Sequence, residues 1–220
     1  MDWSQVTALT IPEGNVKQVS TNGVVLWKKG LLPRFVEYIE STGTQFINTG
    51  IIPNQDDVWV EVDCQKQVNA PADGMVFAII ASSSPRLNIN LYASSQAYFR
   101  YGSLNKYILL TNTDRHTYKM APTGAYIDDT LTFSNTDTSS FVGNTEAICL
   151  FGRFANNRYN SMIYPFVGKI YSFKFGQGGT LIKDLRPCLD DNNVACMYDM
   201  VTGKYFYNQG TGEFIAGATV

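Results

Sequence analysis

The sequence predicts an all-β sandwich, and three observations support this fold class. Apolar and polar residues alternate along many short segments, which is the pattern of strands with one buried face. Gly, Asn and Pro turn signals separate these segments at short intervals. No long stretch repeats with the 3.6-residue period of an amphipathic helix. We therefore expect about a dozen short strands in a sandwich or jelly roll.

Length, composition and charge exclude several classes of function. A chain of 220 residues with 45% hydrophobic residues can bury a full core. The net charge of −2 argues against binding to duplex nucleic acid, which needs a basic face. The longest apolar run, 75–81, is too short to insert into a membrane, and residues 1–20 lack a secretory signal pattern. We expect a protein that is made in a cytoplasm.

The stretch 166–190 predicts the central hairpin of the domain. Alternation places Tyr171, Phe173 and Phe175 on one side of a strand, with Ser172 and Lys174 on the other. The glycines in 176–179 permit the positive φ of a tight turn. A second strand, 180–185, then returns along the first. Residue 187 is a proline, which predicts the end of that strand because proline cannot donate to a ladder.

Residues 1–33 form a separate small unit in this interpretation, and 34–220 form the main domain. Runs at 6–11, 16–19 and 24–27 predict a β-meander, whose last two strands flank Asn22-Gly23, a strong hairpin signal. A unit this small is marginal in water, so we expect it to dock on another surface. The alternative is that these strands extend the sheets of the main domain.

Several segments resemble one family. EYIESTGTQFINTGI opens the main domain, RHTYKMAPTGAYIDD follows in its middle, and GKIYSFKF precedes a Gly-rich turn, LIKDLRPC and MYDMVTGKYFYNQGTG. Together they resemble the concanavalin/laminin-G-like jelly rolls of bacteriophage tail, fibre and other virion structural proteins. Asp129 stands where glycine is usual in the family's meander.

The resemblance implies a virion protein with a lectin-like domain that binds host-surface glycans. Its N-terminal segment would attach to other virion proteins, and a homo-oligomer is expected. One alternative is a purely structural head-decoration or tail component that acts by protein–protein contacts. A second alternative is a glycan-degrading enzyme of the glucanase-like jelly-roll class.

The strand at 58–65 argues against the enzyme alternative. Glucanases of this fold carry E-x-D-x-E on such a strand, whereas Glu61 and Asp63 are followed here by Gln65. A retaining glycosidase needs two carboxyl groups roughly 5–5.5 Å apart, one of which donates a proton. Gln65 has no acidic proton, so we expect a non-catalytic protein with no cofactor.

Two further segments predict a glycan-binding face. Alternation groups the polar and aromatic side chains of 88–92 on one face, and those of 98–100 on another. Sugars bind to flat aromatic faces and to amide or guanidinium groups that hydrogen-bond their hydroxyls. The alternative is an ordinary solvated sheet face, which carries the same residue types. The candidate glycan-binding residues, which we expect to form one platform, are Trp59, Asn88, Asn90, Tyr92, Tyr98 and Arg100.

The remaining candidate groups favour structural roles. His116 has no cluster of ligands at metal-binding spacing and is expected to be a strand residue, so no metal site is predicted. Calcium binding remains an alternative at the acidic turns at 128–129 and 190–193, although such turns are common without a bound ion. The four cysteines lack C-x-x-C spacing and are expected to be buried thiols. Cys188–Cys196 is the one pair for which a disulfide remains an alternative.

Overall fold

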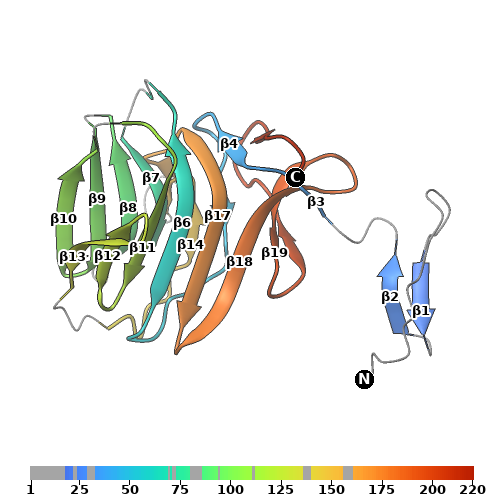
Figure 1. The fold of residues 1–220 in the computed structure, drawn as a ribbon, viewed down its shortest axis with the longest axis horizontal. Coiled ribbons are helices and arrows are strands. Elements are labelled where there is room, and N and C mark those ends of the chain that lie inside the picture. Colours follow the sequence, from blue (N-terminus) through green and yellow to red (C-terminus); the bar gives the residue numbers. More distant parts are fainter. Residues whose placement is uncertain are drawn as a thin grey trace. The chain divides into compact units, whose positions relative to one another are not determined.

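The structure is a computed structural model of the chain (Figure 1). It describes residues 18–21, 24–28, 33–68, 70, 73–79, 86–93, 95–110, 112–135, 140–155 and 161–220. The chain divides into two compact units, Met1–Pro33 and Arg34–Val220. In the parts of the chain so described, no helix is long and apolar enough to cross a membrane.

The first unit contains the predicted hairpin. Strands β1 (Gln18–Thr21) and β2 (Val24–Lys28) pair antiparallel, with Thr21 opposite Val24. This register leaves a two-residue connection, as the Asn22-Gly23 signal predicts. The expected strand at 6–11 lies outside the described residues, so the full meander stays a prediction.

The second unit is built from two antiparallel sheets (Figure 1). Within the described ranges, the smaller sheet has six strands in the order β10 (Leu104–Leu109), β9 (Gln96–Gly102), β8 (Arg86–Tyr92), β7 (Gly74–Ile79), β14 (Ile148–Leu150) and β5 (Ile47–Asn48). The hairpin of β15 (Arg153–Ala155) and β16 (Ser161–Ile163) contacts this sheet through β7.

The larger sheet has the β6–β17–β18 strands near its centre. Its order is β13 (Thr130–Ser134), β12 (Gly124–Ile127), β11 (His116–Ala121), β6 (Trp59–Lys66), β17 (Gly168–Gln177), β18 (Thr180–Leu189), β19 (Ala195–Asp199) and β20 (Lys204–Phe206). Three short strands pair beside this path: β3 (Arg34–Phe35) with β18, β4 (Ile39–Ser41) with β17, and β21 (Ile215–Ala216) with β4.

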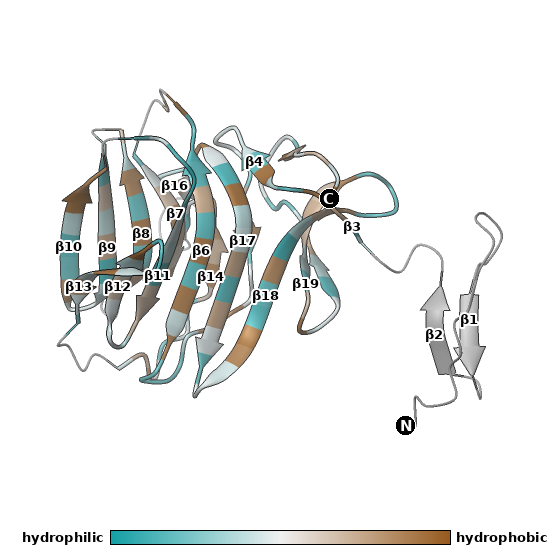
Figure 2. Cartoon of the chain, viewed as in Figure 1, coloured by the Kyte–Doolittle hydropathy of each residue, from teal (hydrophilic) through white to brown (hydrophobic). Residues whose placement is uncertain are grey.

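The core lies between the two sheets. Alternate residues of β6 and β8 turn inward, which Figure 2 shows as bands of brown and teal along these strands. Phe77 of the smaller sheet meets Phe173 of the larger sheet edge to face, with ring centroids 5.8 Å apart. The hydroxyl of Tyr101 donates to the carbonyl of Val58 at 2.7 Å, so a buried polar group also joins the sheets. The predicted all-β sandwich is confirmed.

The prediction for Tyr171 is wrong. The pairing of β17 with β6 shifts between Ile170 and Ser172, so one extra residue is inserted in β17. Such a β-bulge breaks the alternation of side chains. Phe173 and Phe175 are fully buried as expected, but Tyr171 lies on the outer face, where its ring stacks 3.8 Å from the Arg115 guanidinium carbon.

The prediction for Pro187 is also wrong, because β18 continues to Leu189. The pairing with β17 reaches Leu185, and the pairing with β3 begins at Cys188. Pro187 therefore lies between two partner strands, and its carbonyl accepts a hydrogen bond from the Val36 N–H at 3.1 Å. The turn itself follows the prediction, since Gly178 and Gly179 have φ of 58° and 68°.

The four cysteines are buried thiols, as expected. Cys188 and Cys196 are directly opposite on β18 and β19, with their Sγ atoms 3.5 Å apart and no disulfide between them. The hydrogen bond with Cys188, together with burial, raises the pKa of Cys196.

A buried carboxylate organises the end of β19. Asp199 is fully buried and pairs with Lys183 at 2.9 Å. It also accepts hydrogen bonds from the Asp184 and Val201 N–H groups, each at 3.1 Å. Burial opposes ionisation of this carboxyl, but the hydrogen bonds from Lys183, Thr202 and the two N–H groups outweigh it and lower the pKa of Asp199.

The corrected face of Tyr171 yields a stability test. We expect Phe173→Ala to lower the free energy of unfolding by about 3–5 kcal/mol, because it leaves a cavity between the sheets. Tyr171→Ala removes two outer ring contacts, to Arg115 and Tyr38, and one side-chain hydrogen bond, and we expect a loss below about 2 kcal/mol. Urea denaturation measures both, and equal losses would place Tyr171 in the core.

The Asp199 network yields a test that depends on pH. We expect Asp199→Asn to lower the free energy of unfolding at pH 7 by about 2–4 kcal/mol, since it removes the charge that Lys183 faces. The folded-state pKa of Asp199 is lowered, so its contribution is complete above the unfolded-state pKa of about 3.9 and disappears as the pH falls through the folded-state value.

Urea denaturation of both proteins between pH 7 and pH 3 checks this expectation. The difference in the free energy of unfolding between the two proteins should shrink in the acid part of that range. A difference that stays constant down to pH 3 would contradict the role given to the ionised Asp199.

Candidate functional site

The outer face of β8, β9 and β10 brings together most of the predicted glycan-binding residues. Asn88, Asn90 and Tyr92 point away from the core because Leu87, Ile89 and Leu91 fill it. The register of β8 with β9 then places Asn88 opposite Arg100 and Asn90 opposite Tyr98. Five of the six residues therefore share one face.

Hydrogen bonds fix the polar groups of β9 on this face. Asn105 of β10 lies opposite Arg100, and its Oδ1 accepts from the Tyr98 hydroxyl and from Arg100 Nε, the latter at 3.2 Å. The guanidinium of Arg100 lies 4.6 Å from the centroid of the Tyr98 ring. Because each group is held by the other two, the array is ordered before any ligand arrives.

The two asparagines form the floor of the face. Only 5% of Asn88 and 4% of Asn90 is exposed, and Asn88 Nδ2 donates to Asn90 Oδ1. A buried amide is costly unless it is hydrogen-bonded, which this contact partly provides. An ordinary solvated sheet face would leave such side chains exposed, so this face is more enclosed than the sequence pattern indicated.

Tyrosines cross the same face. Tyr92 meets Tyr98 edge to face at 5.9 Å, and burial raises the pKa of Tyr92, with the charge of Arg100 acting in the opposite direction. Tyr107 lies opposite Tyr98 on β10 and is 62% exposed.

The sequence interpretation missed β10, and with it Asn105 and Tyr107. The alternation in LNKYIL, with Leu104 buried and Asn105 and Tyr107 outward, was the available signal.

The structure separates Trp59 from the other five residues. Trp59 belongs to β6 in the larger sheet and points away from the core, so it lies on the opposite outer face of the sandwich. Gly176 of β17 lies directly opposite Trp59, and a Cβ at Gly176 would come within 2.2 Å of the indole Nε1. The expectation of one platform that includes Trp59 is wrong, because its strand and β8 belong to different sheets.

The glucanase-like residues on β6 are all engaged by neighbours. Glu61 pairs with Lys174 at 2.8 Å, and Asp63 accepts two hydrogen bonds from Arg115, at 2.8 and 2.6 Å. The amide oxygen of Gln65 accepts from the Tyr171 hydroxyl at 2.9 Å. These contacts make a row of two ion pairs and one neutral hydrogen bond on the outer face of the larger sheet.

His116 and the acidic turns make local contacts. The His116 ring nitrogens lie 2.7 Å from Asp128 Oδ2 and 2.9 Å from Asn112 Oδ1. Partial burial opposes the ionised Asp128, but hydrogen bonds from His116 and the Thr117 N–H outweigh it and lower the pKa of Asp128.

The second acidic turn is closed by its own backbone. Asp190 accepts hydrogen bonds from backbone N–H groups within this turn. Among the described residues, no three His, Cys, Asp or Glu side chains gather where they could hold a metal ion.

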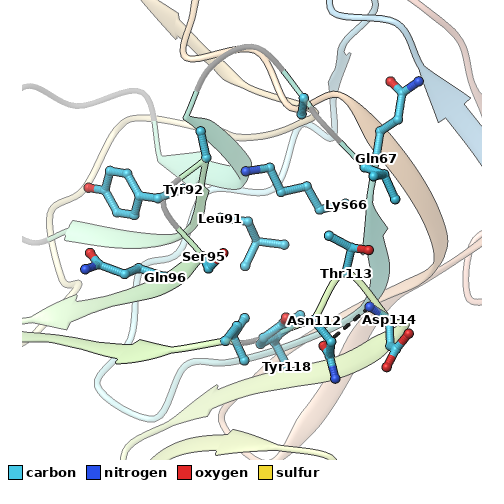
Figure 3. A pocket seen from close by; sticks show the side chains of 14 residues that line it. Lys66, Gln67, Leu91, Tyr92, Ser95, Gln96, Asn112, Thr113, Asp114 and Tyr118 are labelled. Carbon is cyan, nitrogen blue, oxygen red and sulfur yellow. Dashed lines mark hydrogen bonds between the residues drawn. The ribbon is translucent and has the colours of Figure 1, made fainter.

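A pocket of about 190 Å³ opens at one end of the sandwich (Figure 3). Tyr92 and Gln96 line it from the smaller sheet, Lys66 from the end of β6, and Asn112 and Asp114 from the loop before β11. Burial lowers the pKa of Lys66, although the charge of Asp73 opposes the shift. Tyr92 lines this pocket and also belongs to the polar face, and its ring points away from Lys66 and Asn112 (Figure 3).

Comparison with known proteins gives similarity to solved structures alone. No protein-family model and no curated protein matches the chain. The CBM40 domain of the Ruminococcus gnavus IT-sialidase is similar in structure, with a TM-score of 0.48 and 10% identity, over 74% of this chain and 95% of that domain. The same domain bound to α2,3-sialyllactose gives 0.48 and 10%, over 66% and 91%. Bound to α2,6-sialyllactose it gives 0.47 and 11%, over 74% and 96%.

Proposed function

We propose that this protein is a non-catalytic, lectin-like module that binds glycans on the outer face of β8, β9 and β10. The observation that carries the proposal is the array of Tyr98, Arg100 and Asn105, fixed by mutual hydrogen bonds on an outer sheet face. Sugars offer hydroxyls to guanidinium and amide groups, and their C–H faces pack on aromatic rings. This face provides all three kinds of group within two adjacent strands.

The shape of the face favours an extended oligosaccharide over a small buried ligand. Pockets for small molecules usually enclose about 300–1,000 Å³. The pocket at the end of the sandwich near Tyr92 has a volume of about 190 Å³, and a hollow near Asn88 has a volume of about 80 Å³. Both volumes are below that range, so in this proposal most of a bound glycan lies on the open face around Tyr98.

We further propose that the module belongs to a bacteriophage virion and that residues 1–33 attach it to other virion proteins. The support is the sequence resemblance to phage jelly rolls, together with the division of the chain into Met1–Pro33 and Arg34–Val220. In this proposal the protein is a homo-oligomer located in the particle, with a host-surface glycan as its external partner. The alternative of a purely structural tail or head-decoration component predicts that another protein covers the polar face.

Glycan binding yields a test by substitution. We expect Tyr98→Ala and Tyr107→Ala to weaken binding of a glycan-array hit roughly 2- to 12-fold each, because a stacked aromatic ring contributes about 0.5–1.5 kcal/mol beyond its buried area. Arg100→Ala should weaken it at least as much, because it also removes the partner of Asn105. Isothermal titration measures the affinity.

Trp59→Ala is the matched control for these variants. It removes an outward aromatic residue from the opposite face, so binding should be unchanged. If Trp59→Ala abolishes binding while Tyr98→Ala does not, the site lies on the larger sheet and this proposal is wrong. Thermal denaturation of each variant shows whether the fold is retained.

The two-unit organisation yields a second test. We expect a chain that begins at residue 34 to fold, to keep its glycan affinity, and to lose incorporation into the particle. The reason is that every core residue that the structure describes belongs to Arg34–Val220. Circular dichroism and particle reconstitution measure the two outcomes. A truncated chain that is insoluble would show that residues 1–33 complete the main core.

A further inference from the structure

Two cysteines face each other near the end of the larger sheet. Cys188 of β18 lies directly opposite Cys196 of β19 in an antiparallel pair, so both side chains point to the same face. Their Sγ atoms are 3.5 Å apart, both residues are fully buried, and no disulfide joins them. Two free thiols so placed have two chemical states within reach, a hydrogen-bonded pair and a disulfide.

The backbone around the pair already has the geometry that a disulfide needs. Directly opposite residues of antiparallel strands have Cα atoms roughly 4.5–5.5 Å apart, and disulfides join Cα atoms roughly 4.4–6.8 Å apart. A disulfide bond is about 2.0 Å long, so the two Sγ atoms must approach each other by roughly 1.5 Å. Rotation about the two Cα–Cβ bonds supplies a movement of this size. The strands therefore keep their register when the bond forms.

The thiols lie on the face of the larger sheet that is turned away from the sandwich core. Met197 follows Cys196 in β19 and belongs to the core, so Cys196 points to the opposite face. Tyr198 shares that face and meets Tyr205 of β20 edge to face at 5.1 Å. Burial raises the pKa of Tyr205 to about 12, and the nearby Cys188 acts in the same direction. Aromatic rings thus cover the pair.

The strand that carries this cover is short and lies at the end of the sheet order. Strand β20 has three residues and pairs with β19 alone among the described strands. Short edge segments open locally at a lower free-energy cost than central strands. Opening of β20 would lift Tyr205 and admit a small oxidant to the two thiols.

A covalent bond at this position would restrain a part of the sheet that short strands support. The pairing of β18 with the long strand β17 ends at Leu185. In the described part of the chain beyond that point, β18 pairs with β19, which has five residues, and with β3, which has two. A link from Cys188 to Cys196 would join β18 to β19 where the long pairing has ended.

We propose that Cys188 and Cys196 are a site of oxidative modification, where the two thiols close into a cross-strand disulfide once the protein leaves a reducing environment. The oxidant is a low-molecular-weight disulfide such as oxidised glutathione. One cysteine thiolate attacks a sulfur of the oxidant and displaces a glutathione thiolate. The other then attacks the protein sulfur of the mixed disulfide and displaces the second. Two protein thiols lose their protons and are oxidised, and one oxidised glutathione becomes two glutathiones.

The surroundings decide which state is present. A reducing cytoplasm keeps thiols reduced, whereas an oxidising medium outside cells favours disulfides. The hydrogen bond with Cys188, together with burial, raises the pKa of Cys196, so little thiolate forms at neutral pH and oxidation is slow. This modification does not depend on the proposed glycan binding.

The test incubates the full folded chain with oxidised glutathione at about pH 8.5, near the usual pKa of a thiol. The protein is then unfolded and treated with an alkylating reagent, and mass spectrometry counts the labelled thiols. The reduced chain has four cysteines, and we expect oxidation to remove two of the labels. Peptide mapping should find Cys188 linked to Cys196. The Tm should rise by roughly 5–10 °C, because the bond restricts the unfolded chain.

Variants assign the reaction to this pair. We expect Cys188→Ala and Cys196→Ala each to keep their three remaining thiols and to gain no thermal stability under the same conditions. Cys64→Ala is the matched control, since Cys64 is also a buried thiol on a strand of the larger sheet. It should still form the bond between Cys188 and Cys196. Circular dichroism checks that all three variants are folded.

Three outcomes would overturn the proposed modification. If the folded protein keeps four thiols at equilibrium with the oxidant, the cysteines are only a hydrogen-bonded pair. If the bond forms in urea and not in the folded protein, the strands hold the sulfurs apart. If the oxidised protein melts below the reduced protein, the bond distorts β18 and β19 instead of restraining them. None of these outcomes bears on glycan binding, which the Tyr98→Ala and Tyr107→Ala titrations test separately.

Discussion

The burial of alternate residues between two sheets is the constraint on which the rest of this structure depends. Contacts such as Phe77 with Phe173 hold the sheets together, and each strand of the core must present its apolar side to them. Every intervening residue is then forced outward, where neighbouring strands determine its partners. The polar face of β8, β9 and β10 is therefore a direct consequence of how the core is filled, and its groups are placed with the rigidity of a paired sheet.

Local periodicity explains why much of this arrangement could be predicted. The inward positions of Val60 and Val62, and of Leu87 and Ile89, follow from alternation within a single strand. The Gly178-Gly179 turn follows from residues that tolerate positive φ. Tyr171 could not be placed in this way, because its bulge arises from the pairing of β17 with β6, which lies far away in the sequence.

In the candidate site too, alternation within one strand could be predicted, whereas contacts between strands could not. Alternation grouped Asn88 with Asn90, and Tyr98 with Arg100, but strand order decides which groups meet. Trp59 points outward, as alternation predicts, but alternation cannot show that its strand pairs with β11 and β17 in the larger sheet. Asn105 and Tyr107 were missed because β10 is an edge strand, whose inward position at Lys106 is exposed and weakens the alternation.

The two outer faces of the sandwich differ in how they balance charge, and this difference bears on which of them meets a ligand. On the larger sheet, Glu61 pairs with Lys174, and Asp63 pairs with Arg115. Such surface pairs satisfy one another and leave little charge for an external partner. On the smaller sheet, Arg100 is held by the neutral groups of Tyr98 and Asn105, and these tyrosine and amide groups are fixed in place. A partner that offers hydroxyls to guanidinium and amide groups and a flat face to aromatic rings gains most on this second face.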